Sequence, residues 1–100
     1  MIELVIPPAA QRDADSLELM RAWVAEKGLH CSLKIGVYED QGIPEALAWG
    51  TILADAARHI ANALTSSNGK DTNETLREIR RHFEAELDSP TSEMRGGFVE

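Results

Sequence analysis

A chain of 100 residues and 11.0 kDa has the size of one small domain. Hydrophobic residues make up 43% of it and charged residues 27%, a balance that excludes a chain disordered over most of its length. The net charge of −7 disfavours nucleic acid and anionic membranes as partners, because binders of both need clustered cations. The single cysteine, Cys31, excludes an internal disulfide and a CxxC motif.

Residues 2–6 are rich in β-branched side chains and fit a short strand, although the pattern leaves open whether they join a sheet. Pro7 and Pro8 end the segment, because proline cannot donate to a strand ladder. The N-terminus lacks the basic start of a secretory signal, and no apolar stretch approaches the roughly 20 residues that span a bilayer. We therefore expect a cytoplasmic protein.

Residues 13–27 are predicted to form the first helix. Asp15 and Glu18 have the spacing of a capping box, and carboxylates suit the partial positive charge of a helix N-terminus. Apolar side chains then recur at helical spacing: Leu17, Met20, Trp23 and Val24.

Residues 29–38 have the clearest strand pattern in the chain, because apolar and polar residues alternate. One face holds Leu29, Cys31, Leu33, Ile35 and Val37, and the other holds His30, Ser32, Lys34, Gly36 and Tyr38. This pattern is typical of an antiparallel sheet with one buried face.

A long central helix is predicted over residues 44–65, with Pro44 in its first turn. It is apolar around most of its circumference, which indicates that protein surrounds it. A third helix follows over residues 73–87, with a narrow apolar edge and a charged remainder that places it on the surface. Residues 88–100 have few apolar side chains and are expected to form a flexible C-terminal tail.

These elements predict an α+β fold, with three helices on a small antiparallel sheet of two to three strands and a single domain over residues 1–87. A sheet of two strands is marginal by itself. Either residues 97–99 add a third strand, or two copies of the chain pair their strands across a two-fold axis. The shortness of the C-terminal segment favours the homodimer.

Two groups of residues are candidates for a functional site. His30, Ser32, Lys34 and Tyr38 share the polar face of the predicted strand and form the better candidate binding surface, although polar faces are common in such sheets. Asp55, Arg58 and His59 lie on the polar stripe of the central helix, where pairing among their own charges is the commoner role. No metal-binding, nucleotide-binding or catalytic motif occurs, so we expect no metal, no cofactor and no catalytic residue.

Several short segments resemble a family of small bacterial proteins catalogued as a conserved domain of unknown function. They are Pro7-Pro8-Ala9, Arg21-Ala22-Trp23, Gly28 to Leu33, Ala48-Trp49-Gly50, Leu53-Ala54-Asp55 and Arg58-His59-Ile60. The resemblance covers residues 4–87 and implies a bacterial source and an α+β fold. It brings no activity, cofactor or site residue with it.

We expect a small accessory or protein-interaction domain that acts as a homodimer and is not an enzyme. One alternative is a protein that binds an anionic metabolite between the strand 29–38 and the central helix. The other alternative is an enzyme that uses Asp55 and His59 as an acid–base pair. The sequence identifies neither the partner nor the ligand.

Overall fold

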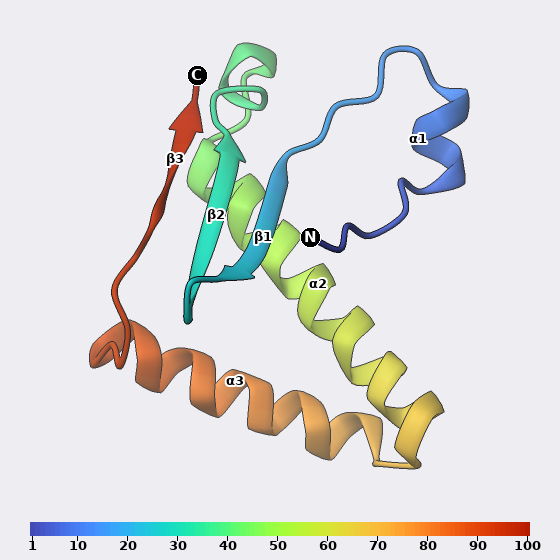
Figure 1. The fold of residues 1–100 in the computed structure, drawn as a ribbon, viewed down its shortest axis with the longest axis vertical. Coiled ribbons are helices and arrows are strands. Elements are labelled where there is room, and N and C mark those ends of the chain that lie inside the picture. The colour runs from blue at the N-terminus through green and yellow to red at the C-terminus, as the bar shows by residue number, and fades with distance from the viewer. The chain divides into compact units, whose positions relative to one another are not determined.

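The computed structural model describes all 100 residues, Met1–Glu100, and groups them into two compact units. One unit comprises Met1–Ile35 and Arg95–Glu100, and the other comprises Gly36–Met94. The first contains α1 (Pro8–Arg12), β1 (Met20–Ala25), β2 (Gly28–Lys34) and β3 (Gly96–Val99) (Figure 1). The second contains the 3₁₀ turn η1 (Glu39–Gln41) and the helices α2 (Glu45–Asn68) and α3 (Thr72–Asp88). The expected α+β class is confirmed, while the single domain over residues 1–87 stays a prediction.

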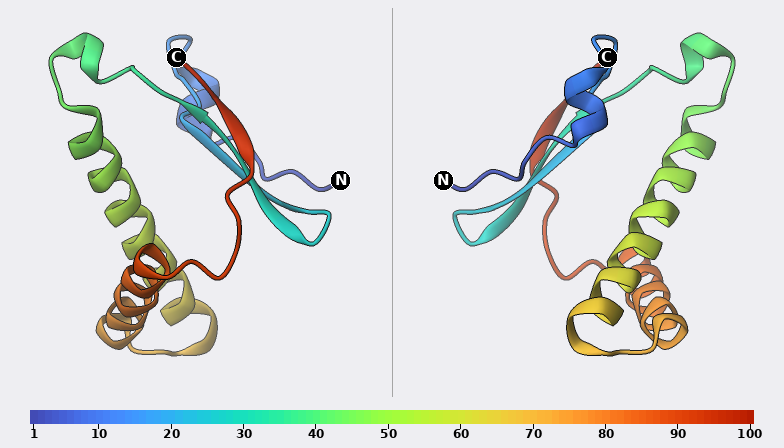
Figure 2. Two further views of the ribbon diagram at one scale, coloured as in Figure 1. Left: turned by 90° about the vertical axis from the view of Figure 1, so that its left-hand side faces the viewer. Right: turned by 90° about the vertical axis from the view of Figure 1, so that its right-hand side faces the viewer.

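The three strands form one sheet in the order β1-β2-β3. β1 and β2 are antiparallel, with Trp23 opposite His30, and β3 runs parallel to β2, with Phe98 opposite Leu33 (Figure 2). The sheet is therefore mixed, whereas we expected an antiparallel one. The strand predicted over residues 29–38 is confirmed as far as Lys34. Gly36 leaves the extended conformation with a φ of 100°, so residues 36–38 are not part of it.

The helix predicted over residues 13–27 is wrong. The chain forms β1 instead, and a two-residue turn at Glu26 and Lys27 leads into β2. Both turn residues have positive φ, 49° and 64°, as the turns that join twisted hairpin strands require. The apolar residues of this segment also fit a period of two, and Trp and Val favour strands. Pairing with β2 decides between the two patterns.

The segment expected to be a flexible C-terminal tail contains β3, which is the alternative that the sequence disfavoured. Cys31 N–H donates to Arg95 O at 3.1 Å, and Ile35 N–H donates to Val99 O at 2.7 Å. Gly96 has a φ of 112° and lies so close to β2 that a Cβ atom there would collide with the carbonyl oxygen of Cys31. The approach of β3 thus depends on glycine at this position.

The two long helices lie close to their predicted bounds. α2 begins after Pro44 and ends at Gly69, whose φ of 71° is the left-handed conformation that closes many helices. α3 begins after Asp71, whose side chain accepts a hydrogen bond from Glu74 N at 2.9 Å and so caps the helix. The hydroxyls of Thr65 and Thr72 are 2.6 Å apart and join the two helices near their connecting turn.

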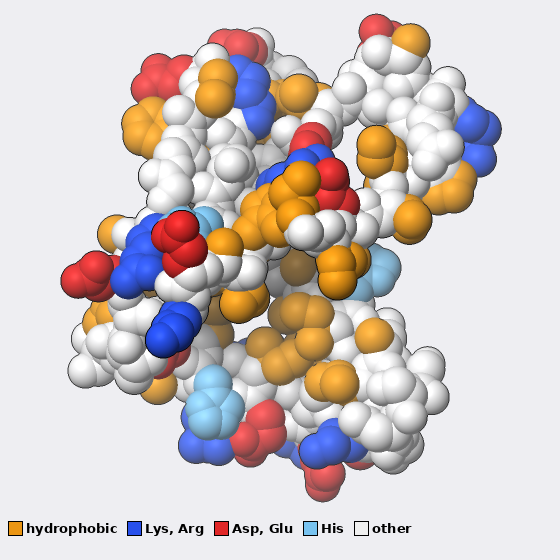
Figure 3. All heavy atoms as spheres, viewed as in Figure 1, with side chains coloured by type: hydrophobic (Ala, Val, Ile, Leu, Met, Phe, Trp, Pro, Cys, Tyr) orange, Lys and Arg blue, Asp and Glu red, His pale blue; other side chains and the backbone are white.

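Little of the chain is buried. Only Ala61 of α2, at 0% exposure, and Ala48, at 6%, are buried, and both belong to the helical unit. Large apolar side chains stay on the surface of both units, where orange groups mark the apolar residues in Figure 3. Each unit by itself therefore lacks a core of large side chains.

Candidate interaction surface

The sheet has one apolar face, made by the side chains that alternate along its three strands. The register places Met20, Ala22 and Val24 of β1 beside Leu29, Cys31 and Leu33 of β2, with Phe98 of β3 next to Leu33. Val24 is 85% exposed and Phe98 65% exposed. An apolar sheet face of this kind is normally covered by another layer of protein.

The opposite face of the sheet is polar and contains three of the four predicted binding residues. His30, Ser32 and Lys34 lie on it together with Trp23 and Arg21 of β1. The Nε2 atom of His30 is buried without a hydrogen-bond partner, beside the cross-strand residue Trp23. The fourth predicted residue, Tyr38, precedes η1 and belongs to the helical unit, so it is not on this strand.

β1 forms a free edge of the sheet. Lys34 N–H donates to Leu19 O at 2.9 Å. Because hydrogen-bonded pairs recur at every second residue of an antiparallel ladder, the residues of β1 that bond to β2 in this phase include Arg21 and Trp23. The backbone groups of the residues between them point away from β2. These residues are Met20, Ala22 and Val24. Their N–H and C=O groups find no partner in the chain.

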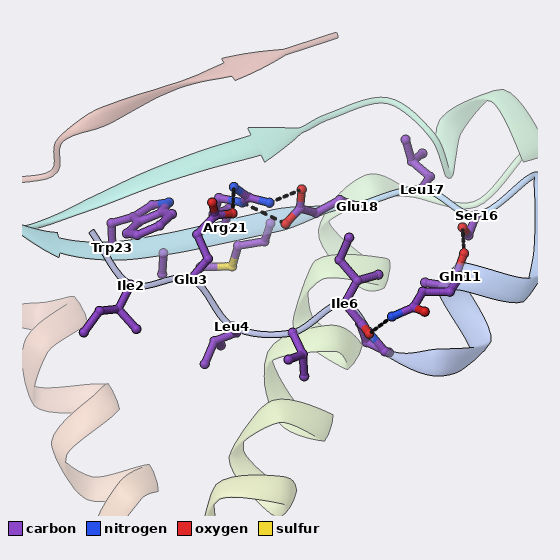
Figure 4. Close-up of a pocket in the computed structure, with 15 residues that line it drawn as sticks. Ile2, Glu3, Leu4, Ile6, Gln11, Ser16, Leu17, Glu18, Arg21 and Trp23 are labelled. Atoms are coloured by element: carbon purple, nitrogen blue, oxygen red, sulfur yellow. Dashed lines mark hydrogen bonds and ion pairs between the residues drawn. The ribbon is translucent and has the colours of Figure 1, made fainter.

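A hollow of ≈ 660 Å³ lies between this edge and the N-terminal segment. Figure 4 shows residues 2–6 running beside β1, with Ile2 and Leu4 on the segment and Trp23 on the strand. No backbone hydrogen bond joins the two, and residues 2–6 form no strand. The strand considered for residues 2–6 is therefore absent, although Ile2 and Leu4 are exposed apolar side chains.

One ion-pair cluster links the N-terminal segment to β1. Arg21 donates to Glu18 at 3.0 Å and to Glu3 at 3.3 Å, and its guanidinium carbon lies 5.8 Å from the ring centre of Trp23. The hydrogen bond to Glu18, followed by the charge of Glu18, raises the pKa of Arg21. Because these carboxylates already balance the guanidinium, it does not call for an anionic ligand.

The second predicted group lies on α2 but does not form the expected pair. Asp55 makes an ion pair with Arg58, while His59 forms no hydrogen bond. All three side chains are exposed, with Asp55 and Arg58 at 51% and 63%. The carboxylate thus neutralises the arginine and does not orient the imidazole.

Glu45 is the most connected carboxylate of the helical unit. Its Oε1 atom accepts from Gly36 N at 2.8 Å and from Trp49 Nε1 at 3.1 Å, and its Oε2 atom accepts from Glu39 N at 3.3 Å. The hydrogen bond from Gly36 is the main reason that the pKa of Glu45 lies below its ordinary value. The side chain holds the turn before α2 against the helix, which is a structural role.

No group of three or more His, Cys, Asp and Glu side chains lies close enough together to hold a metal ion. Among the helices, none combines the length and the apolar character that crossing a membrane requires.

The edge of β1 is the surface that sequence reasoning missed. We predicted a helix over residues 13–27, and a helix offers no strand edge with free backbone N–H and C=O groups. The signal is present in the order of residues 20–24, where Arg21 and Trp23 alternate with Met20, Ala22 and Val24.

Comparison with known proteins gives a family and a structural neighbour. A protein provisionally described as a pyruvate dehydrogenase, from the photosynthetic bacterium Rhodopseudomonas palustrus, has a solved structure with a TM-score of 0.69 to this one. The two sequences are 29% identical, over 93% of this chain and 90% of that one. No curated protein matches the chain. The model of the family named Domain of unknown function (DUF5076) matches residues 3–91, and the chain therefore belongs to this family.

Proposed function

We propose that the chain is a small homodimeric protein-interaction domain that acts by association and not by catalysis. The observation that carries the proposal is the absence of any large buried side chain. Ala48 and Ala61 alone are buried, while apolar residues on the sheet and on both long helices are exposed. Such surfaces usually mark contacts between proteins.

The amount of exposed surface supports a partner. The chain has 8487 Å² of accessible surface. Its two units have 41 residues (35 from the N-terminal part and six from the C-terminal end) and 59 residues. At the mean mass of the chain, two separate globules of these sizes would expose about 6800 Å² together. The surface of the chain exceeds this value by about 1700 Å².

A surplus of this size matches the interface of an obligate dimer, which buries roughly 1,000–2,500 Å² on each partner. A second copy is a natural occupant, because each copy brings the same exposed faces and the pair can close by two-fold symmetry. We also propose a cytoplasmic location, where the single cysteine, Cys31, would stay reduced.

Native mass spectrometry, combined with light scattering on a size-exclusion column, tests the proposal. We expect a species of about 22 kDa, twice the 11.0 kDa of the chain, at micromolar concentration. A mass of 11.0 kDa at high micromolar concentration would overturn the homodimer. An additional bound mass would favour the anionic-metabolite binder, for which Lys34→Ala is the variant expected to weaken binding.

The description of the structural neighbour provides the enzymatic alternative. If this chain oxidised pyruvate, the purified protein would reduce an electron acceptor such as ferricyanide only when pyruvate is added. We expect no pyruvate-dependent reduction above a heat-denatured control, with and without added thiamine diphosphate and Mg²⁺. Turnover that rises in proportion to protein concentration would refute a role limited to association.

A further inference from the structure

We propose that β1 pairs antiparallel with β1 of a second copy, across a two-fold axis that passes beside Ala22. The inference rests on the homodimer proposed above and specifies its interface. It joins two three-stranded sheets into one continuous sheet of six strands, with an apolar face on one side and a polar face on the other.

The first argument is that no backbone hydrogen bond occupies this edge. The backbone groups of Met20, Ala22 and Val24 point outward, as the hydrogen bond from Lys34 N–H to Leu19 O determines. Natural edge strands usually carry a proline, a bulge or an inward charge that prevents pairing with other chains. The sequence of β1, MRAWVA, contains no proline, and its one charge, Arg21, lies on the polar face. An edge of this kind is suited to pairing.

The second argument is that the edge is complementary to itself in one register. With Ala22 opposite its symmetry mate, Met20 lies opposite Val24 of the partner subunit on the apolar face. On the polar face, Arg21 lies opposite Trp23 of the partner subunit. The same two residue types already make a cation–π contact within one chain, at 5.8 Å.

The neighbouring registers are less favourable. Outward-pointing residues must face each other, so the register can shift only in steps of two residues. One step in one direction places Arg21 opposite its own symmetry mate, and like charges directly opposite are destabilising. One step in the other direction places Arg21 opposite Ala25 of the partner subunit, so the interface loses the pairing of Arg21 with Trp23. Of the three registers, the one centred on Ala22 alone places Arg21 opposite Trp23 of the partner subunit.

The third argument is that the chain leaves room for the incoming strand. The hollow of ≈ 660 Å³ lies between β1 and residues 2–6, whose backbone does not bond to the edge (Figure 4). The ion pair between Arg21 and Glu3, at 3.3 Å, is the polar link across it. A strand of the second copy would enter this hollow, separate Glu3 from Arg21 and pair with β1. The exposed side chains of Ile2 and Leu4 would then cover apolar parts of the incoming strand.

Disulfide trapping tests the register. In a background in which the only cysteine is removed by Cys31→Ala, the variant Ala22→Cys places two thiols on residues directly opposite each other. Hydrogen-bonded partners have Cα atoms about 5.5 Å apart, which is within the range of a disulfide. The matched control is Val24→Cys, on the same strand and the same face. Its two copies would be displaced by four residues, about 13 Å, which is too far for a bond.

With oxidised glutathione as the oxidant, we expect Ala22→Cys to convert to a covalent species of doubled mass and Val24→Cys to remain unlinked. Equal cross-linking of the two variants, or none in either while the background protein has a doubled native mass, would overturn the register and leave the homodimer standing. If the background protein has the native mass of one chain, 11.0 kDa, both proposals are overturned.

A second variant tests edge pairing without any cross-link. Ala22→Pro removes an N–H that points away from β2, so the β1–β2 ladder keeps its hydrogen bonds. We expect its native mass to fall from about 22 kDa to 11.0 kDa, with an unchanged far-ultraviolet circular dichroism spectrum. A variant that is folded and still dimeric would overturn pairing through β1.

Discussion

A homodimer predicts that thermal stability depends on protein concentration, because unfolding releases two chains from one folded particle. Each tenfold rise in concentration adds about 1.4 kcal/mol per dimer to the free energy of unfolding. A dimer of two 100-residue chains gains about 0.4 kcal/mol/K of entropy on unfolding, at about 2.1 cal/mol/K per residue. Dividing this gain in free energy by the unfolding entropy gives an increase in Tm of about 3 °C per tenfold rise in concentration, or about 7 °C between 1 and 100 µM.

The assay is reversible thermal unfolding, followed by circular dichroism at 222 nm in cells of different path length. The wild-type protein should show the increase, while Ala22→Pro should unfold at a lower Tm that does not change with concentration. A wild-type Tm that agrees to within 1 °C over the same concentration range would refute the reasoning, because a monomer has no mass-action contribution.

Three further predictions concern the chain itself. Ala61→Leu places a larger side chain at the one fully buried residue and should lower the free energy of unfolding by about 1–3 kcal/mol. Ala63→Leu, at an exposed site two residues away, should change it by no more than about 0.5 kcal/mol. Urea denaturation measures both variants, and equal losses would contradict the packing. Hydrogen bonds lower the pKa of Glu45 in the folded state, so its stabilising effect is present at neutral pH and is lost as the pH falls through the folded-state pKa. The Tm of Glu45→Gln should therefore lie below that of the wild type at pH 7 and approach it in acid; a difference that stays constant with pH would contradict this role. The amide of Ala22 should exchange its hydrogen about as slowly as that of Trp23 in the dimer, and fast exchange at Ala22 alone would contradict edge pairing.

The long helices are predictable from the sequence because their local signals agree with their packing. Pro44 begins α2, a left-handed glycine at position 69 ends it, and Asp71 caps α3. Each signal acts over one turn of backbone and does not require knowledge of what lies elsewhere in the chain. The bounds of both helices therefore agree with the prediction to within a few residues.

The sheet is predictable only in part, because strand pairing joins residues distant in sequence. The alternation in residues 29–34 identifies β2, but its two neighbours carry weak local signals. β1 fits both a helical period and a strand period, and the turn at Glu26 and Lys27 lacks the glycine or asparagine that usually marks such hairpins. β3 has four residues, two of them glycine, a composition that predicts a flexible segment.

These strand positions change where a second copy would bind. With β2 in the centre of the sheet, the two free edges belong to β1 and β3, and they differ in quality. β3 is short and begins with two glycines, so it offers a weak template, whereas β1 has six residues and a self-complementary register. Pairing of β1 with β3 of another copy would be head-to-tail and would build a ring or a filament of more than two copies. Pairing of β1 with itself closes after two copies, which makes a finite dimer the expected assembly of this chain.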